Sequence, residues 1–164
     1  MANRSHFKNQ KKMKENKEYK FITAFVESYR NAHSSKAIQP VGNNQSKYAD
    51  CEIVLNNEIV KIEAKLLNDT NSNSTDFYNL IGEIIGTLKK PSLLKEQGES
   101  FNEVVGFLVP FESKTVFYSL WQKNIKPNGV KYCSAFNVKY LLVYNQITSK
   151  IDVLTFDTNN DEWK

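Results

Sequence analysis

The segment from residue 48 to residue 67 constrains the fold more than any other part of the chain. It consists of two stretches with strand-like alternation, 48–55 and 58–67, joined by Asn56-Asn57. Asparagine tolerates a positive φ better than most residues, so this pair suits a two-residue turn between antiparallel strands. The sequence therefore predicts a β-hairpin with its tip at the two asparagines.

A two-residue turn also fixes which residues face each other across the hairpin. It places Leu55 opposite Glu58, and counting outward along both strands places Asp50 opposite Glu63. Directly opposed Cβ atoms lie about 4.5–5.5 Å apart. Lys65 follows Glu63 by two positions and therefore lies on the same face.

The distribution of apolar residues supports this register independently of the turn. One face carries only apolar or small residues: Cys51, Ile53, Leu55, Val60, Ile62, Ala64 and Leu66. The other carries Tyr48, Asp50, Glu52, Val54, Ile59, Lys61, Glu63 and Lys65. A slip of one residue would turn the polar set toward the core.

Two pairs of charged residues face each other on the polar side of the hairpin. Glu52 lies opposite Lys61, and we expect an ordinary cross-strand ion pair there. Asp50 lies opposite Glu63, and like charges in this position destabilise a sheet. A hard divalent cation with oxygen ligands is the natural compensator. Lys65 is a second source of positive charge.

The rest of the chain alternates helical and strand-like patterns. We expect helices at 17–31, 76–90 and 113–123, strands at 37–41 and 104–109, and a terminal hairpin of 139–144 and 151–156. The strand, helix, strand order through residue 109 implies a parallel pair. The predicted fold class is α/β, with a mixed central sheet flanked by helices.

The hairpin and its acids resemble a known nuclease motif. Tyr48-Ala49-Asp50, followed in the next strand by Ile62-Glu63-Ala64-Lys65-Leu66, resembles the PD-(D/E)xK superfamily, which includes restriction-endonuclease-like and Holliday-junction-resolvase-like enzymes. The resemblance covers roughly residues 17–109, and Ala49 stands where the motif name has Pro. It implies a restriction-endonuclease-like core and metal-dependent hydrolysis of DNA, possible substrates including branched or otherwise structured DNA.

The resemblance also assigns roles to the motif residues. Asp50 and Glu63 would hold Mg²⁺ or Mn²⁺, with the carbonyl oxygen of Ala64 as a third ligand. Lys65 would position the attacking water or stabilise the transition state. The motif alone does not separate an endonuclease from a non-catalytic nucleic-acid or protein-binding module on the same fold, or from an unrelated interaction domain.

Members of this superfamily often carry a further carboxylate on the first helix. Glu18 lies in line with the apolar stripe of that helix, whereas Glu27 lies on its far side, so we predict that Glu18 completes the site. Glu83, on the helix after Lys65, points well off the apolar face, and we expect it to be a surface acid. Gly82 and Gly86 suggest a close approach of another backbone.

Charge and composition bear on partners and location. The net charge is +4, and much of the excess lies in residues 1–16, a basic segment that we expect to be a disordered arm ahead of a single domain at 17–164. The basic residues of this region, Arg4, Lys8, Lys11, Lys12 and Lys14 together with Lys17 and Lys20 just beyond it, either solubilise the chain or contact phosphates. Cutting both strands of DNA would favour a homodimer.

No apolar stretch of signal-peptide or membrane-spanning type is found, and Cys51 and Cys133 suit a reduced, cytoplasmic setting. Aromatic residues of the C-terminal half could stack on bases, but core packing is the favoured interpretation for most of them: Phe111, Phe117, Tyr118, Trp121, Tyr140 and Tyr144.

Overall fold

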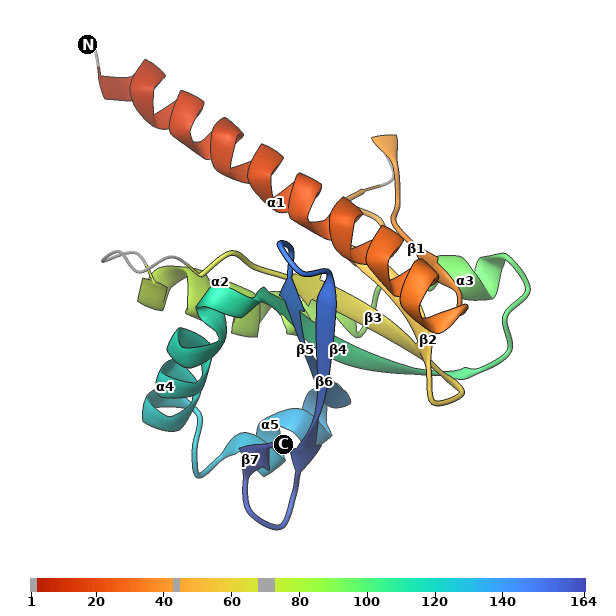
Figure 1. Ribbon diagram of the computed structural model, residues 1–164. Helices are drawn as coiled ribbons and strands as arrows, with labels where there is room; N and C mark the ends of the chain where they lie inside the picture. The colour runs from red at the N-terminus through yellow and green to blue at the C-terminus, as the bar shows by residue number, and fades with distance from the viewer. Residues whose placement is uncertain (1–2, 43–44, 68–72) are drawn as a thin grey trace.

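A mixed β-sheet organises the protein (Figure 1). The computed structural model describes residues 3–42, 45–67 and 73–164, with side chains described from Lys17 in the first helix and from Ser74 in the second. The sheet has seven strands in the order of the chain: β1 (Ala37–Ile38), β2 (Cys51–Leu55), β3 (Glu58–Ala64), β4 (Asn102–Pro110), β5 (Val138–Asn145), β6 (Lys150–Asp157) and β7 (Glu162–Trp163). β3, β4 and β5 run parallel, and the other neighbours are antiparallel.

Helices cover both faces of this sheet (Figure 1). They are α1 (Asn3–His33), α2 (Asn73–Thr87), α3 (Leu93–Glu96), α4 (Lys114–Asn124) and α5 (Gly129–Phe136), with the 3-10 helix η2 (Phe111–Ser113) ahead of α4. α1 packs on one face through a largely aliphatic cluster, and α2, α4 and α5 pack on the other through an aromatic-rich cluster. The α/β class and the mixed sheet are as predicted. Among the described helices, none is both long and apolar enough to cross a membrane.

The hairpin forms with the predicted register. Leu55 pairs with Glu58 at the tip and Cys51 with Ile62 at the open end. Asn56 and Asn57 have φ values of 51° and 59°, which is the backbone that a two-residue turn of type I′ requires. The apolar face lies in the cluster under α1, so the alternation in the sequence does select the buried face.

The crossover from β3 through α2 to β4 is parallel, as the order of elements predicts. The ladder runs from the pair Glu58 and Asn102 to the pair Ala64 and Leu108. The N–H of Lys65 donates to the carbonyl of Leu108 at 3.0 Å, which carries the connection one residue past the end of β3. Lys65 is thereby held beside the sheet.

The first helix starts earlier than the sequence pattern indicated. α1 begins at Asn3 rather than near Lys17, so it takes in residues 3–16, where the sequence led us to expect a disordered arm. This segment has no apolar period, but more than half of its residues have high helix propensity, namely four lysines with Arg4, Gln10, Met13 and Glu15, and it lacks the helix breakers Gly and Pro. The side chains of residues 1–16 lie outside the described part of the chain, and the contacts predicted for Arg4 and the lysines of the arm lie there too.

Two helices escaped the sequence analysis. α3 is a single turn that starts after Pro91, and α5 begins at Gly129 within a segment that reads as a turn. Short helices leave too few residues for a period of 3.6 to be recognised, so tertiary packing rather than local pattern defines them.

Candidate active site at the open end of the hairpin

The two opposed acids lie together at the open end of the hairpin. Asp50 immediately precedes β2, and its Oδ2 accepts a hydrogen bond from the N–H of Ala64 at 2.8 Å. Glu63 lies in β3 and is 3% exposed. The side chains of Asp50 and Glu63 interact directly, and this contact raises the pKa of Glu63. The predicted juxtaposition of the two carboxyl groups is therefore present.

Glu63 resists ionisation at this position. Burial, followed by the charge of Asp50, raises its pKa from 4.5 to about 8. Two neighbours act in the opposite direction: the hydroxyl of Thr87 donates to Oε1 of Glu63, and the Nζ of Lys90 lies 3.5 Å from the same oxygen. Because these partners do not offset burial and repulsion, the pair retains a proton near neutral pH unless a cation replaces it.

Lys65 extends from the end of β3 into the same group of charges. Its Nζ lies 3.5 Å from Oε1 of Glu83. Burial by itself would lower the pKa of this lysine, but the negative charges of Glu18 and Glu83 outweigh burial and raise it. Lys65 is therefore a firmly protonated cation beside the acid pair.

Glu18 reaches this group from α1. Burial raises its pKa from 4.5 to about 7, and the charge of Asp50 adds to the rise, whereas Lys65 and a hydrogen bond from the backbone of Leu66 lower it. The structure thus brings Glu18 to Asp50 and Lys65, in agreement with its predicted position. Glu27 is exposed further along α1.

Glu83 differs from its sequence interpretation. It is partly exposed, as expected, but its carboxylate pairs with Lys65 and lines the hollow above the acids. The helical wheel failed here because α2 crosses the end of the hairpin, so that a side chain off the apolar stripe faces the site and not open solvent.

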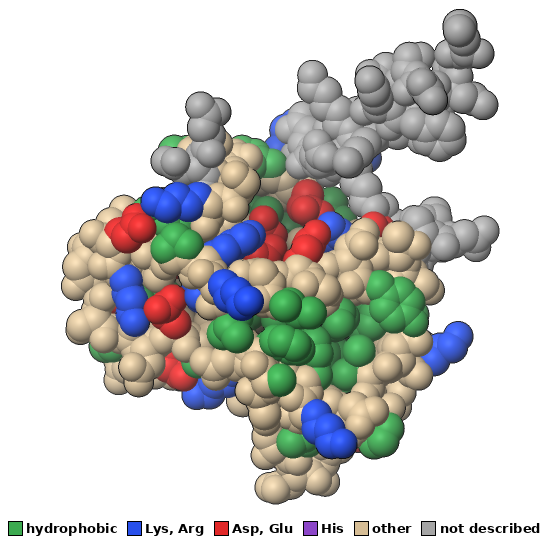
Figure 2. Space-filling model, turned by 180° about the vertical axis from the view of Figure 1, so that it is seen from behind, with side chains coloured by type: hydrophobic (Ala, Val, Ile, Leu, Met, Phe, Trp, Pro, Cys, Tyr) green, Lys and Arg blue, Asp and Glu red, His purple; other side chains and the backbone are tan. Residues whose placement is uncertain are grey.

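A shallow hollow of about 470 Å³ opens over these groups. It is lined by Glu18, Gln45, Ser46, Asp50, Glu63, Gly82, Glu83, Gly86 and Lys90. Figure 2 shows acidic side chains gathered in a hollow with lysine side chains close by. A Cβ at Gly82 or Gly86 would meet no atom within 4 Å, so these glycines allow no close backbone approach of the kind predicted. They instead keep the wall of the hollow free of side chains.

The donor groups fit a hard divalent cation. The N–H of Lys65 points to β4, so by strand alternation the N–H and carbonyl of Ala64 point the other way, toward Asp50. Asp50, Glu63 and the Ala64 carbonyl offer only oxygen atoms. Within the described ranges, no group of three or more His, Cys, Asp and Glu side chains is arranged to hold a metal. Mg²⁺ requires only one or two carboxylates, because it keeps several waters.

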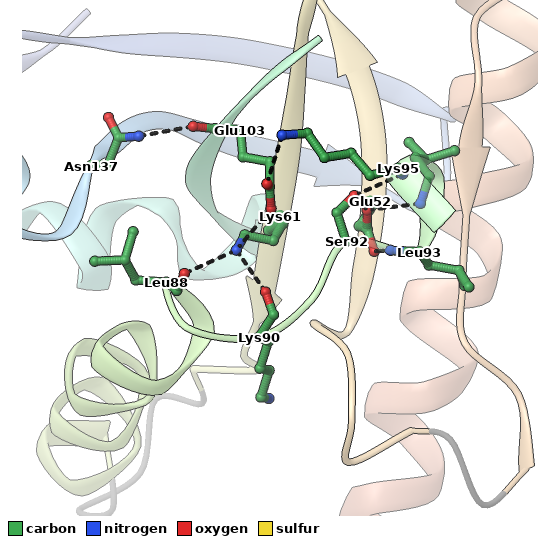
Figure 3. A network of polar contacts seen from close by, with 10 residues as sticks. Glu52, Lys61, Leu88, Lys90, Ser92, Leu93, Lys95, Glu103 and Asn137 are labelled. Atoms are coloured by element: carbon green, nitrogen blue, oxygen red, sulfur yellow. Dashed lines mark hydrogen bonds and ion pairs between the residues drawn. The ribbon is translucent and has the colours of Figure 1, made fainter. Parts of the chain in front are cut away.

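The neighbouring charged pair behaves differently from its prediction (Figure 3). Glu52 and Lys61 are opposed in the register, as expected, but each side chain binds other partners. The Nζ of Lys61 donates to the carbonyls of Leu88 and Lys90 at 3.1 and 2.9 Å and lies 3.1 Å from Oε1 of Glu103. Lys61 therefore satisfies backbone carbonyls that follow the end of α2.

Glu52 serves the start of the next helix (Figure 3). Its carboxylate accepts the hydroxyl of Ser92 at 2.5 Å and the backbone N–H groups of Leu93 and Leu94 at 2.7 and 3.2 Å. Glu52 and Lys61 are almost fully buried, because α2 and α3 cover the polar face of the hairpin. The expected ion pair is wrong because helix ends offer these charges better-placed partners.

The contacts of Lys61 hold the C-terminal end of α2 and the turn after it in place. This segment supplies two site residues, Thr87 and Lys90, that the sequence analysis missed. Thr87 is the last residue of α2, and Lys90 lies in the turn that follows, where its own carbonyl accepts a hydrogen bond from Lys61. Both side chains contact Glu63. Glu83, Thr87 and Lys90 follow an i, i+4, i+7 spacing, and this polar stripe was the signal that could have identified them.

Most C-terminal aromatic residues serve the core, as favoured. Phe117, Trp121, Tyr140 and Tyr144 are almost fully buried, whereas Phe111 is half exposed. The buried rings therefore have no surface to offer a base.

The fold and the site define an α/β protein with a mixed sheet and an acidic hollow at the open end of its hairpin. No protein-family model and no curated protein matches the chain. It is similar to the solved structure of an XisH family protein from Nostoc punctiforme, with 16% identity, coverage of 85% of this chain and 94% of the other, and a TM-score of 0.45. It is also similar to an FdxN element excision controlling factor protein from Anabaena variabilis, with 15% identity, coverage of 87% and 96%, and a TM-score of 0.47. Likeness of this degree says nothing about activity.

Proposed function

We propose that this protein is a metal-dependent endonuclease that hydrolyses phosphodiester bonds of DNA. One observation carries the proposal: Asp50 and Glu63 are opposed at the end of a buried hairpin, although their repulsion contributes to a pKa of about 8 for Glu63. A purely structural hairpin gains nothing from this arrangement. Its cost is offset when a cation binds both carboxylates.

Each residue of the cluster has a role in this chemistry. Asp50 and Glu63 would hold Mg²⁺ or Mn²⁺ with the Ala64 carbonyl, and the cation would activate water and offset the charge that develops on the phosphate. Lys65 lies beside the acids and stabilises negative charge on the phosphoryl oxygens in the transition state. Glu18 adds a third carboxyl group whose pKa of about 7 lets it exchange a proton near neutral pH.

The proposed reaction is a displacement at phosphorus. A bond forms between the water oxygen and phosphorus, and one phosphorus–oxygen ester bond breaks. The attacking water loses a proton to a carboxylate of the site or to solvent, and the departing oxygen takes up a proton. The products are one strand end with a phosphate and one with a hydroxyl group.

A second candidate function is a non-catalytic nucleic-acid or protein-binding module on the same fold. It is favoured by the contacts of Glu63, which already has Thr87 and Lys90 as partners without a metal. In such a module the acid pair would keep its proton, and a divalent cation would add nothing to stability. The two candidates therefore differ in their response to metal.

The deciding experiment combines metal-dependent stability with cleavage. Thermal unfolding is measured with Mg²⁺, Mn²⁺ and Ca²⁺, and the protein is incubated with plasmid, linear and four-way-junction DNA with and without Mn²⁺. We expect cation-dependent stabilisation that grows with concentration, and cleavage only with Mg²⁺ or Mn²⁺.

Matched variants make the result specific to the site. Asp50→Asn should abolish both responses, and Lys65→Ala should abolish cleavage while the cation still stabilises the fold. Glu27→Gln, an exposed acid on α1, is the control and should change neither. Full metal-dependent cleavage by both Asp50→Ala and Lys65→Ala would rule out the assignment.

A further inference from the structure

A second recess lies next to the acidic hollow. Its volume is about 430 Å³, and it is lined by Lys17, Lys20, Phe21, Leu66, Leu67, Pro110, Glu112, Ser113 and Gln146. These residues come from α1, from the chain that leaves β3, from the end of β4 with the adjoining η2, and from the β5–β6 turn. Four separate parts of the chain thus form one groove.

The base of the groove is held by the fold. The hydroxyl of Ser113 donates to the carbonyl of Leu67 at 2.6 Å, and both side chains are buried. This bond ties the chain after β3 to the end of η2, just ahead of α4. Phe21 packs in the core beneath the same region, so the apolar floor is fixed while the charged groups stand at the surface.

The two lysines of the groove differ from most described lysines. Lys36, Lys95 and Lys139, for example, pair with Glu99, Glu103 and Glu58. Lys17 and Lys20 are exposed, and no ion pair joins either of them to a residue that the structure describes. They are three positions apart on α1, so they stand next to each other.

The groove adjoins the candidate active site through chain neighbours at two places. On α1, Glu18 belongs to the acidic hollow, and its chain neighbour Lys17 belongs to the groove. On the other side, Lys65 lies beside the acids, and Leu66 and Leu67 lead directly into the groove. An extended ligand bound at the acids can therefore continue into the groove.

We propose that this groove holds the DNA strand on one side of the bond that is cut, with Lys17 and Lys20 contacting consecutive phosphates. The inference rests on the proposed function for the position of the cut, but the groove itself is a phosphate-binding surface. Unpaired ammonium groups suit backbone phosphates, and the apolar floor of Leu66, Leu67 and Pro110 suits the sugars between them. The exposed Glu112 also lines the groove, and its negative charge limits how much of the wall can accept phosphate.

The test measures binding in a protein that cannot cut. In the Asp50→Asn background and without divalent metal, a fluorescein-labelled single-stranded DNA is titrated by anisotropy from 50 to 300 mM NaCl. Lys17→Ala/Lys20→Ala should weaken binding at least tenfold at low salt. It should also lower the slope of log K against log salt by about 1.4, since each phosphate contact on a single strand contributes about 0.7.

The matched control removes the same charge elsewhere. Lys123→Ala/Lys131→Ala changes two exposed lysines of α4 and α5 and should leave the affinity within about twofold and the slope unchanged. Circular dichroism melting checks that both double variants fold. Equal losses in both, an unchanged slope for Lys17→Ala/Lys20→Ala, or no binding by the parent protein would each overturn the inference.

A cleavage assay of the same oligonucleotide separates the two proposals. Cleavage by the unmodified protein together with equal binding by both double variants would refute the proposed role of the groove and support the nuclease activity. Selective loss of binding in Lys17→Ala/Lys20→Ala without any cleavage by the unmodified protein would keep the groove and refute the nuclease.

Discussion

Two neighbouring pairs of charged residues on the same face of one hairpin have opposite characters. Glu52 and Lys61 carry opposite charges and are almost fully buried, and each binds backbone groups at a helix end. Asp50 and Glu63 lie two positions further out and carry like charges, and burial followed by the charge of Asp50 raises the pKa of Glu63 to about 8. The two pairs lie on the same face of one hairpin, and only Asp50, just ahead of β2, is not almost fully buried.

The difference separates charges that serve the fold from charges that, under the proposed function, serve a ligand. Lys61 and Glu52 satisfy carbonyl and N–H groups that the helices leave without partners, and burying a charge is tolerable when it is bonded in this way. Asp50 and Glu63 face a hollow, and burial together with their mutual repulsion keeps a proton on the pair in the absence of a cation. The four predictions below test this contrast.

Removing the repulsion should destroy activity without harming the fold. In Asp50→Asn we expect cleavage to fall at least about 1,000-fold, because a ligand of the cation and much of its charge are lost. Metal-free stability should stay equal or rise, because Glu63 no longer faces a carboxylate. Single-turnover cleavage and urea unfolding measure the two effects, and a clear drop in metal-free stability would contradict the contrast.

Removing the buried charge of Lys61 should lower stability, in contrast to the removal of Asp50. Lys61→Met should lower the free energy of unfolding by about 3 kcal/mol, because the carbonyls of Leu88 and Lys90 lose their buried partner. The control is Lys36→Met, whose ion pair with Glu99 is on the surface and should cost under about 1 kcal/mol. Urea denaturation compares the two variants, and equal costs would remove the distinction between buried and surface partners.

The acid pair should also make stability depend on pH in an unusual direction. The folded pKa of Glu63, about 8, lies above its ordinary value of 4.5, so the folded state binds more protons between these values. Metal-free stability should therefore fall as pH rises through this window, by up to about 1.4 kcal/mol per pH unit, most of it lost by pH 8. Thermal melts from pH 5 to 9 measure this, and Glu63→Gln should make the decline shallower, leaving the part below pH 7 that Glu18 contributes. Saturating Mg²⁺ should weaken the decline, because the cation competes with the proton.

The smallest expected effect concerns the third carboxyl group. Glu18→Gln should reduce cleavage or metal affinity about tenfold, because Glu18 acts next to the acid pair and not as part of it. Glu27→Gln, on the same helix but exposed, should have no effect. Metal titrations followed by melting temperature give the affinities, and equal behaviour of the two variants would remove Glu18 from the site.

Much of the sheet and half of the site could be predicted from local pattern. The asparagine turn and the apolar alternation determined the register of β2 and β3, and that register alone brings Asp50, Glu63 and Lys65 together. The parallel pairing of β3 with β4 followed from the intervening helix. By contrast, the start of α1, the one-turn α3 and α5 were missed, because an apolar period is absent or too short in each.

The sequence by itself determined which acids oppose each other, since side-chain alternation along paired strands is a local rule with a period of two. Only the tertiary structure decided what surrounds them. Glu83, Thr87 and Lys90 reach the site because α2 packs across the hairpin end, and Lys17 and Lys20 border a groove because α1 passes the exit of β3. Such positions depend on how helices pack on a sheet, and no spacing within one segment encodes them.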